Sequence, residues 1–243
     1  NAGYTGIAHI LIEITKFTGD DKYAESARYI TDSLLEEAEK TDDGHIISGE
    51  SGILADGGNI LYLIYASKHF ENQDYLDLAV SLADHITAHA EVVAEQTIKF
   101  HPLNQGYIVD YLDLDPSEKY ERPNFEYGTA GVGFVLAKLY QATGEAKYLT
   151  AAEKAANYID SIAVGNESGE GILIPYRLPD LSHLFYLGYC HGPAGTARLY
   201  EALYEITQKD HYKDQALRLA RGVIEAEAPH VHSDGYWHIF TQC

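Results

Sequence analysis

The sequence predicts an all-α fold of the α/α-toroid type, a ring built from helical hairpins. Three observations predict it: a tyrosine–alanine pattern that occurs four times, a Gly-x-x-Gly step that occurs three times, and an apolar segment after each step. Repetition of this kind is typical of a fold assembled from similar supersecondary units. The units recur about every 50 to 75 residues, which is too long for a slim solenoid and favours a ring of hairpins.

The second helix of each unit carries the pattern Tyr-x3-Ala-x2-apolar-x3-apolar. It occurs in "KYAESARYITDSL", "DYLDLAVSLADHI", "KYLTAAEKAANYI" and "HYKDQALRLARGV". Steps of four, three and four residues place these side chains on one stripe of a helix. The pattern therefore predicts four outer helices that carry equivalent tyrosines near their starts: Tyr23, Tyr75, Tyr148 and Tyr212.

A glycine step precedes the first helix of three units, at Gly3, Gly128 and Gly192. The apolar segments "IAHILIEITKF", "VGFVLAKLYQA" and "TARLYEALYEI" follow it, and the segment around Gly58 is an imperfect further copy. One glycine allows a positive φ and the next allows close packing. We expect these glycines to begin inner helices and to cluster at one end. A phosphate-binding loop is disfavoured, because no Walker lysine and no preceding strand are present.

Two segments interrupt the helical pattern, at residues 99–123 and 166–188, and we expect long loops there with short strands. Neither resembles a linker, so the sequence predicts one α/α-toroid domain over residues 1–243. The chain contains no methionine and stops at Cys243, directly after an aromatic stretch. We therefore expect a piece of a longer chain, in which the toroid is incomplete.

Composition excludes several classes of protein. The formal net charge of -20 disfavours binding to nucleic acid or to an anionic membrane surface. Two cysteines are too few for a disulfide framework and fit a reducing compartment. No apolar run reaches the length of a membrane span. The composition therefore predicts a cytoplasmic protein with no nucleic-acid partner.

The stretch "LGYCHGPAG" joins Cys190 and His191 to a glycine loop, where the sister loop "FEYGTAG" has Glu126 and Tyr127. Thiolate and imidazole are good zinc ligands, but two adjacent residues rarely complete a site. Cys243 follows "GYWHIFTQ", which is similar to "LFYLGY" ahead of Cys190, so both cysteines are predicted to begin neighbouring inner helices. The alternative is a pair of unrelated buried cysteines.

"GYCHGPAG" resembles the Trp-Cys-x-Gly-x-Pro-Gly motif of the lanthionine synthetase C-like family, although Tyr189 replaces the tryptophan and the proline is displaced. The resemblance implies zinc bound by Cys190 and Cys243, with a third ligand beyond the chain. It implies a cyclase that adds a peptide cysteine thiol to a dehydroamino acid, forming a thioether. His191 is then a catalytic candidate for proton delivery, and Tyr127 occupies the position of a family histidine.

Two other functions remain open. Helical toroids also host glycoside hydrolases and sugar epimerases, which use acidic pairs or histidines beside aromatic side chains. The chain has twenty tyrosines, but the spacing singles out no acidic pair. The candidate acids are Asp56, Asp110, Asp113, Asp115 and Glu126. The third function is a non-catalytic module that binds a peptide or a thiol, so the sequence leaves open whether the chain is an enzyme.

His85 and His89 lie four residues apart on a predicted outer helix and can share a face. The sequence lacks the carboxylate of a His-Glu-x-x-His metal motif around them. We therefore interpret both as ordinary surface or groove residues.

Overall fold

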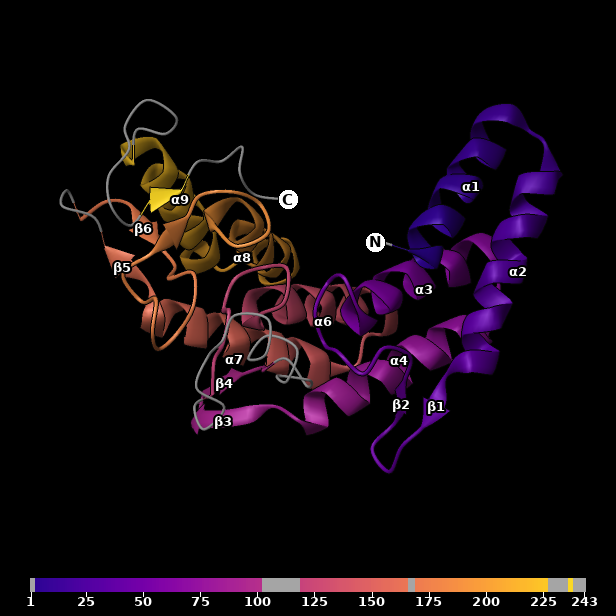
Figure 1. Cartoon of the computed structure of the whole chain (residues 1–243), viewed down its shortest axis with the longest axis horizontal. Coiled ribbons are helices and arrows are strands. Elements are labelled where there is room, and N and C mark those ends of the chain that lie inside the picture. Colours follow the sequence, from indigo (N-terminus) through magenta and orange to yellow (C-terminus); the bar gives the residue numbers. More distant parts are fainter. Residues whose placement is uncertain (1–2, 102–118, 166–168, 227–235, 238–243) are drawn as a thin grey trace. The chain divides into compact units, whose positions relative to one another are not determined.

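The computed structural model describes residues 3–101, 119–165, 169–226 and 236–237. Over these residues the protein is mostly helical (Figure 1). The chain divides into two compact units, residues 1–89 and 90–243, and each is described by itself. The single domain expected from the sequence stays a prediction. Within the described ranges, no helix is both long enough and apolar enough to cross a membrane.

The first unit consists of two helical hairpins and a small β-hairpin. Helix α1 packs against α2, α3 packs against α4, and α1 lies beside α3. Strands β1 and β2 pair antiparallel, and β2 packs on α4. The elements are α1 (Tyr4–Thr18), α2 (Asp21–Glu37), β1 (Glu39–Lys40), β2 (His45–Ile46), α3 (Asp56–Phe70) and α4 (Gln73–Ala88).

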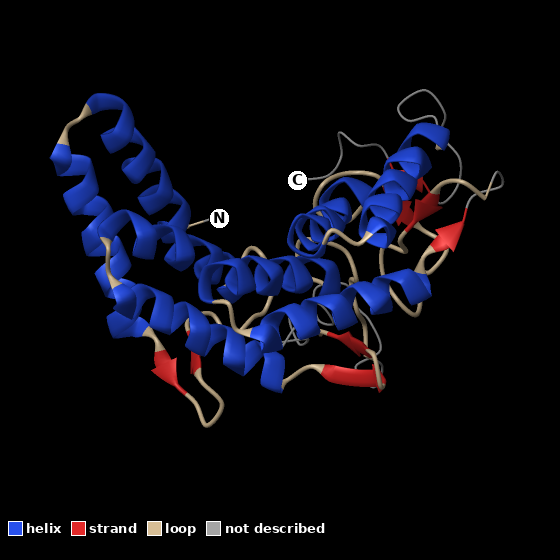
Figure 2. Cartoon of the chain, turned by 180° about the vertical axis from the view of Figure 1, so that it is seen from behind, coloured by secondary structure: helices blue, strands red, loops and turns tan. Residues whose placement is uncertain are grey.

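The second unit repeats this arrangement with longer loops. Helix α6 packs against α7, α8 packs against α9, and α6 lies beside α8. Short strand pairs accompany the helices (Figure 2): β4 contacts α7, and β6 contacts α9. The elements are β3 (Glu91–Ala94), β4 (Thr97–Lys99), α6 (Thr129–Thr143), α7 (Ala146–Ile162), β5 (Val164–Gly165), β6 (Ile172–Leu173), β7 (Phe185–Tyr186), α8 (Pro193–Thr207), α9 (Asp210–Glu225) and β8 (Tyr236–Trp237).

The tyrosine repeat has the predicted place in all four second helices. Each tyrosine is the third residue of α2, α4, α7 or α9. The alanine four residues later is fully buried at Ala27, Ala79 and Ala152. A side chain this small lets the first helix of the hairpin approach closely, so the repeat encodes packing between the two helices.

The two helices of each hairpin are joined by only two residues. The first of these is left-handed in every case, with φ of 72° at Gly19 and 74° at Gly144, and with Glu71 and Gln208 at the other two turns. A left-handed residue is a common way to end a helix, because it redirects the chain while a backbone N–H satisfies a carbonyl of the last turn. The two helices of each unit therefore form a tight hairpin.

Gly3, Gly128 and Gly192 are the N-cap residues of α1, α6 and α8, as predicted. Glycine was expected to begin each loop because it allows a positive φ. This is correct for Gly3, where φ is 86°, and wrong for Gly128 and Gly192, where φ is −110° and −141°. At Gly128 a Cβ atom would lie 1.7 Å from the carbonyl oxygen of Arg122, and at Gly192 it would lie 2.3 Å from that of Tyr186. Close backbone approach therefore requires these two glycines. The two helices that they begin pack side by side, whereas Gly3 belongs to the other unit.

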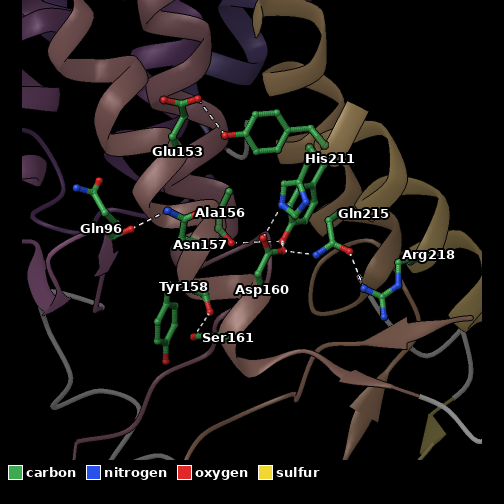
Figure 3. Close-up of polar contacts among 12 residues, drawn as sticks. Gln96, Glu153, Ala156, Asn157, Tyr158, Asp160, Ser161, His211, Gln215 and Arg218 are labelled. Carbon is green, nitrogen blue, oxygen red and sulfur yellow. Dashed lines mark hydrogen bonds and ion pairs between the residues drawn. The ribbon is translucent and has the colours of Figure 1, made fainter. Parts of the chain in front are cut away.

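A polar cluster on Asp160 connects α7 to the α8–α9 hairpin (Figure 3). The carboxylate accepts hydrogen bonds from the Tyr200 hydroxyl at 2.6 Å and from the Gln215 amide at 2.6 Å, and His211 Nε2 lies 2.8 Å from it. Burial, followed by the charge of Asp160, raises the pKa of Tyr200 well above its usual value. The cluster satisfies a buried hydroxyl, so we assign it a structural role.

We expect Tyr75 to make the first unit sensitive to alkali. Its buried hydroxyl donates to Asp32 at 2.5 Å, and burial is the main cause that raises its pKa to about 12. Because the phenol loses its proton more easily in the unfolded chain, its contribution to stability is complete below pH 10 and is lost towards pH 12. Urea unfolding at both ends of this range should show a smaller alkaline loss in Tyr75→Phe. The exposed Tyr29→Phe is the control and should behave as wild type.

Candidate functional site

Similar turns precede α6 and α8, and the two turns lie against each other. The backbone N–H of Glu126 donates to the carbonyl of Cys190 at 2.8 Å. A Cβ atom on Gly195 would lie 2.0 Å from the carbonyl oxygen of Tyr189 and 2.6 Å from Cβ of Phe125. This contact brings the residues before one glycine loop next to those before the other. Residues that correspond in the two loop sequences are therefore neighbours in space.

His191 and Glu126 form an ion pair between these turns. His191 Nε2 lies 3.0 Å from Glu126 Oε2, and the two side chains keep 13% and 14% of their surface exposed. His191 Nδ1 is buried and makes no hydrogen bond to any described residue. Buried polar atoms are normally satisfied, so such an exception calls for an explanation, and a catalytic role is one of them. Both side chains of the pair are thus partly exposed, and Nδ1 of His191 has no hydrogen-bond partner among the described residues.

Three tyrosine rings surround the imidazole of His191. The Tyr127 ring is nearly parallel to it, with an interplanar angle of 20° and a centroid distance of 6.0 Å. The rings of Tyr176 and Tyr186 have their centroids 5.4 and 5.9 Å from it. We call Glu126, Tyr127, Tyr176, Tyr186 and His191, together with Arg122, the His191 cluster.

Arg122 lies against two of the tyrosine rings in the His191 cluster. Its guanidinium carbon lies 5.7 Å from the centroid of the Tyr127 ring and 5.5 Å from that of Tyr176, which is the geometry of cation–π contact. Its Nε atom is buried and has no hydrogen-bond partner among the described residues. The cluster therefore combines an acid–base pair, flat aromatic faces and a cationic donor.

The structure places three of the four predicted site residues. His191 and Tyr127 lie together, and their catalytic roles stay predictions. Cys190 is half-buried beside His191, whereas Cys243 lies outside the described residues. Zinc binding by the two cysteines is therefore untested.

Tyr176, Tyr186 and Arg122 were not predicted from the sequence. All three belong to the long segments that interrupt the helical repeat, and these segments were predicted only as loops. Tyr176 and Tyr186 lie with their ring centroids 4.0 Å apart, so the second segment folds back on itself before reaching His191. The aromatic character of the two tyrosines was the only signal in the sequence.

Of the two candidate acids that the structure describes, Glu126 lies in the His191 cluster and Asp56 does not. Asp56 is buried at the start of α3, and its carboxylate accepts backbone N–H bonds from Ile47, Ser48 and Gly49 at 2.9 to 3.2 Å. These bonds hold the loop that precedes α3, so we assign Asp56 a structural role. Asp110, Asp113 and Asp115 lie outside the described residues.

Glu121 is a further carboxylate close to Glu126 in the sequence, and it was not predicted. Burial raises its pKa, although the Lys99 ammonium group 3.1 Å from Oε2 opposes this shift. The Tyr158 hydroxyl donates to its other oxygen. Only 4% of the residue is exposed, so Glu121 stabilises the packing of β4 and α7 rather than facing a ligand.

Comparison with protein-family models gives no match, and comparison with curated proteins gives none either. Solved structures do match. An inactive variant of the α-1,6-mannanase GH76A of Salegentibacter sp. HEL1_6, in complex with α-1,6-mannotetrose, aligns with 97% of this chain and 63% of its own, with a TM-score of 0.61 and 17% identity. A D-mannose isomerase aligns with 91% of this chain and 60% of its own, with a TM-score of 0.61 and 15% identity.

A glycoside hydrolase family 76 mannosidase of Bacteroides thetaiotaomicron aligns with 95% of this chain and 60% of its own, with a TM-score of 0.55 and 15% identity. The chain thus spans about three fifths of the length of these structures. They are carbohydrate-active enzymes rather than lanthionine synthetase C-like proteins, so the family expected from "GYCHGPAG" is wrong. The associated expectations of a thioether-forming zinc cyclase and a peptide or thiol substrate lose their support.

The glycines give the physical reason for this correction. Gly192 and Gly195 are required because the carbonyl groups of Tyr186 and Tyr189 approach them closely. A loop of this kind begins an inner helix whatever chemistry the protein performs. The glycines of the motif that resembled a zinc loop are therefore explained by packing at the start of the helix. The chain has the α/α-toroid fold that its repeat predicted.

Proposed function

We propose that the chain belongs to a carbohydrate-active enzyme that moves a proton on a hexose, interconverting an aldose and a ketose. The observation that carries this proposal is the His191–Glu126 pair enclosed by three tyrosines. The likeness to a D-mannose isomerase supports it at the level of the fold.

Aldose–ketose interconversion needs a base and an acid at adjacent atoms. A base removes the proton from C2 while the C1 carbonyl oxygen gains a proton, which gives an enediol. The enediol then gains a proton at C1 while its O2 hydroxyl loses one, which leaves the C2 carbonyl of the ketose. Imidazole is the side chain used most often for such transfers, and a carboxylate 3.0 Å away can accept or return the proton. The pair therefore supplies both functions within one contact.

The remaining residues of the His191 cluster fit a sugar ring. Aromatic faces cover the apolar side of a ligand, and a few placed polar groups fix its orientation. Tyr127, Tyr176 and Tyr186 provide both faces and hydroxyl groups. Arg122 provides a hydrogen-bond donor for the negative charge that develops on the sugar oxygen. The Nε atom of Arg122, which has no partner among the described residues, would then have an acceptor.

A glycoside hydrolase is the second candidate, because Glu121 and Glu126 lie five residues apart and burial raises the pKa of Glu121. A raised pKa is what a general acid of such an enzyme requires. We favour the isomerase, because Glu121 is occupied by Lys99 and Tyr158 and is almost inaccessible.

The test incubates the protein with D-mannose, D-glucose and D-fructose in D2O and follows the sugars by NMR. We expect interconversion accompanied by deuterium at C1 or C2, because the proton passes through a side chain that exchanges with solvent. Release of reducing ends from α-1,6-mannotetraose without isomerisation would favour the hydrolase. Absence of both reactions would contradict the proposal.

Replacing Glu126 by glutamine should lower kcat by about 10²-fold or more while KM changes little, because the amide keeps the shape but cannot accept the proton. Initial rates over a range of sugar concentrations measure both constants. Glu205→Gln is the matched control, since its exposed carboxylate pairs with Lys138 outside the His191 cluster. Equal kcat in Glu126→Gln and wild type would remove Glu126 from the mechanism.

A further inference from the structure

We propose that Asp43, His85 and His89 bind a divalent transition-metal ion on the first unit, at a site separate from the His191 cluster. One ligand atom from each of the three residues lies within 4.8 Å of the others. Asp43 lies in the turn between β1 and β2, and the two histidines lie at the end of α4. The sequence separates the aspartate from His85 by about half the unit, which is why no linear metal motif was visible.

The two imidazoles lie close enough to each other to share an ion. Their ring centroids lie 4.4 Å apart, as expected for neighbours four residues apart on a helix. His89 Nδ1 lies 2.9 Å from the carbonyl oxygen of His85, and His85 Nδ1 lies 3.1 Å from the Thr41 hydroxyl. A metal-bound histidine typically uses its second nitrogen in such a contact, which fixes the ring and directs Nε2 at the ion.

The β1–β2 hairpin is held firmly where it presents Asp43. A Cβ atom on Gly44 would lie 2.1 Å from the carbonyl oxygen of Ser81, so the turn packs directly on the backbone of α4. His45 Nδ1 lies 2.7 Å from the Ser81 hydroxyl on the same helix. These contacts, with that of Thr41, keep the carboxylate near the imidazoles before any ion binds.

The carboxylate of Asp43 has no lysine or arginine partner within the described residues, and its ion-pair partner there is His89, 4.0 Å away. Ligands of one ion, each about 2.1 Å from it, lie roughly 3 Å apart, so atoms that now lie within 4.8 Å of one another must close by about 1 to 2 Å. Asp43 and His89 are 46% and 43% exposed and can make this rotation. Two imidazoles and one carboxylate suit Ni²⁺, Co²⁺ or Zn²⁺ rather than Mg²⁺.

The experiment titrates tag-free protein with NiCl2 in a calorimeter, because Ni²⁺ favours nitrogen and oxygen ligands. We expect one ion per chain and at least tenfold weaker binding in His89→Ala and in Asp43→Asn. The controls are Asp42→Asn, an exposed acid of the same turn, and His183→Ala, an exposed histidine of the other unit, and both should bind as wild type. Thr41→Val, which keeps all three ligands, should weaken binding several-fold through His85.

A second readout follows the β1–β2 hairpin directly. Bound metal should slow amide hydrogen exchange in residues 39–46, because it ties the hairpin to α4, and this slowing should vanish in His89→Ala. Circular dichroism confirms that each variant folds, and the two exposed ligand positions make loss of folding a small risk. Wild-type affinity in His89→Ala and Asp43→Asn would overturn the proposal, and so would a wild-type protein that binds no Ni²⁺ at about 100 μM.

Discussion

Replacing His191 by alanine is expected to lower kcat/KM for the sugar substrate by about 10² to 10⁴-fold, the contribution typical of a general acid–base residue. The imidazole is the only ring in the His191 cluster that can both give and take a proton near neutral pH. Its loss also leaves the Glu126 carboxylate, which is 14% exposed, without its imidazole partner. Initial rates of isomerisation measure the loss, and unfolding in urea shows whether the variant is folded.

His191→Gln separates proton transfer from positioning. The glutamine amide can reach the place of Nε2 and hydrogen-bond to Glu126, but it cannot exchange a proton at neutral pH. We expect activity as low as in His191→Ala, together with stability closer to that of wild type. Activity near that of wild type would show that the imidazole only holds Glu126 in place. His183→Ala, at an exposed loop position, is the control for removal of a histidine.

Replacing Gly128 by alanine is expected to destabilise the second unit by at least about 3 kcal/mol, the upper part of the range for overpacking. The added Cβ atom would lie 1.7 Å from the carbonyl oxygen of Arg122 and 2.5 Å from the carbonyl carbon of Pro123. These are backbone atoms, so no side-chain rotation relieves the overlap. The segment would have to move, and it carries Arg122 into the His191 cluster.

Urea unfolding of Gly128→Ala against Gly165→Ala tests this reasoning. Gly165 has open space around its Cβ position and no positive φ, so alanine there should change the free energy of unfolding by less than about 0.5 kcal/mol. The two variants make the same chemical change, and only the approach of the neighbouring backbone differs. Equal stability of both would show that the contact at Gly128 is not close in solution.

The fold and the candidate site were predictable to different degrees. The stripe begun by Tyr75 or Tyr148 was predictable because side chains four and three residues apart lie on one face of any α-helix. The similarity of the two glycine loops showed that Tyr127 and His191 hold corresponding positions, but only the structure shows that their rings are neighbours. The family resemblance, which combined Cys190 with the glycines of one loop, was wrong, and the glycines of that loop are explained by close backbone contacts at the start of α8.

The sequence by itself determined the helices, their turns and the hairpin repeat, because these depend on residues close together in the chain. Only the tertiary structure decided which groups meet. It brings Glu126 to His191 across two helix starts, and it brings Asp43 to His85 and His89 across a β-hairpin. Tyr176 and Tyr186 reach His191 from a segment without helical period. Such contacts depend on loop paths, which no periodic pattern encodes, and the chemistry that we propose for this protein lies in those loops.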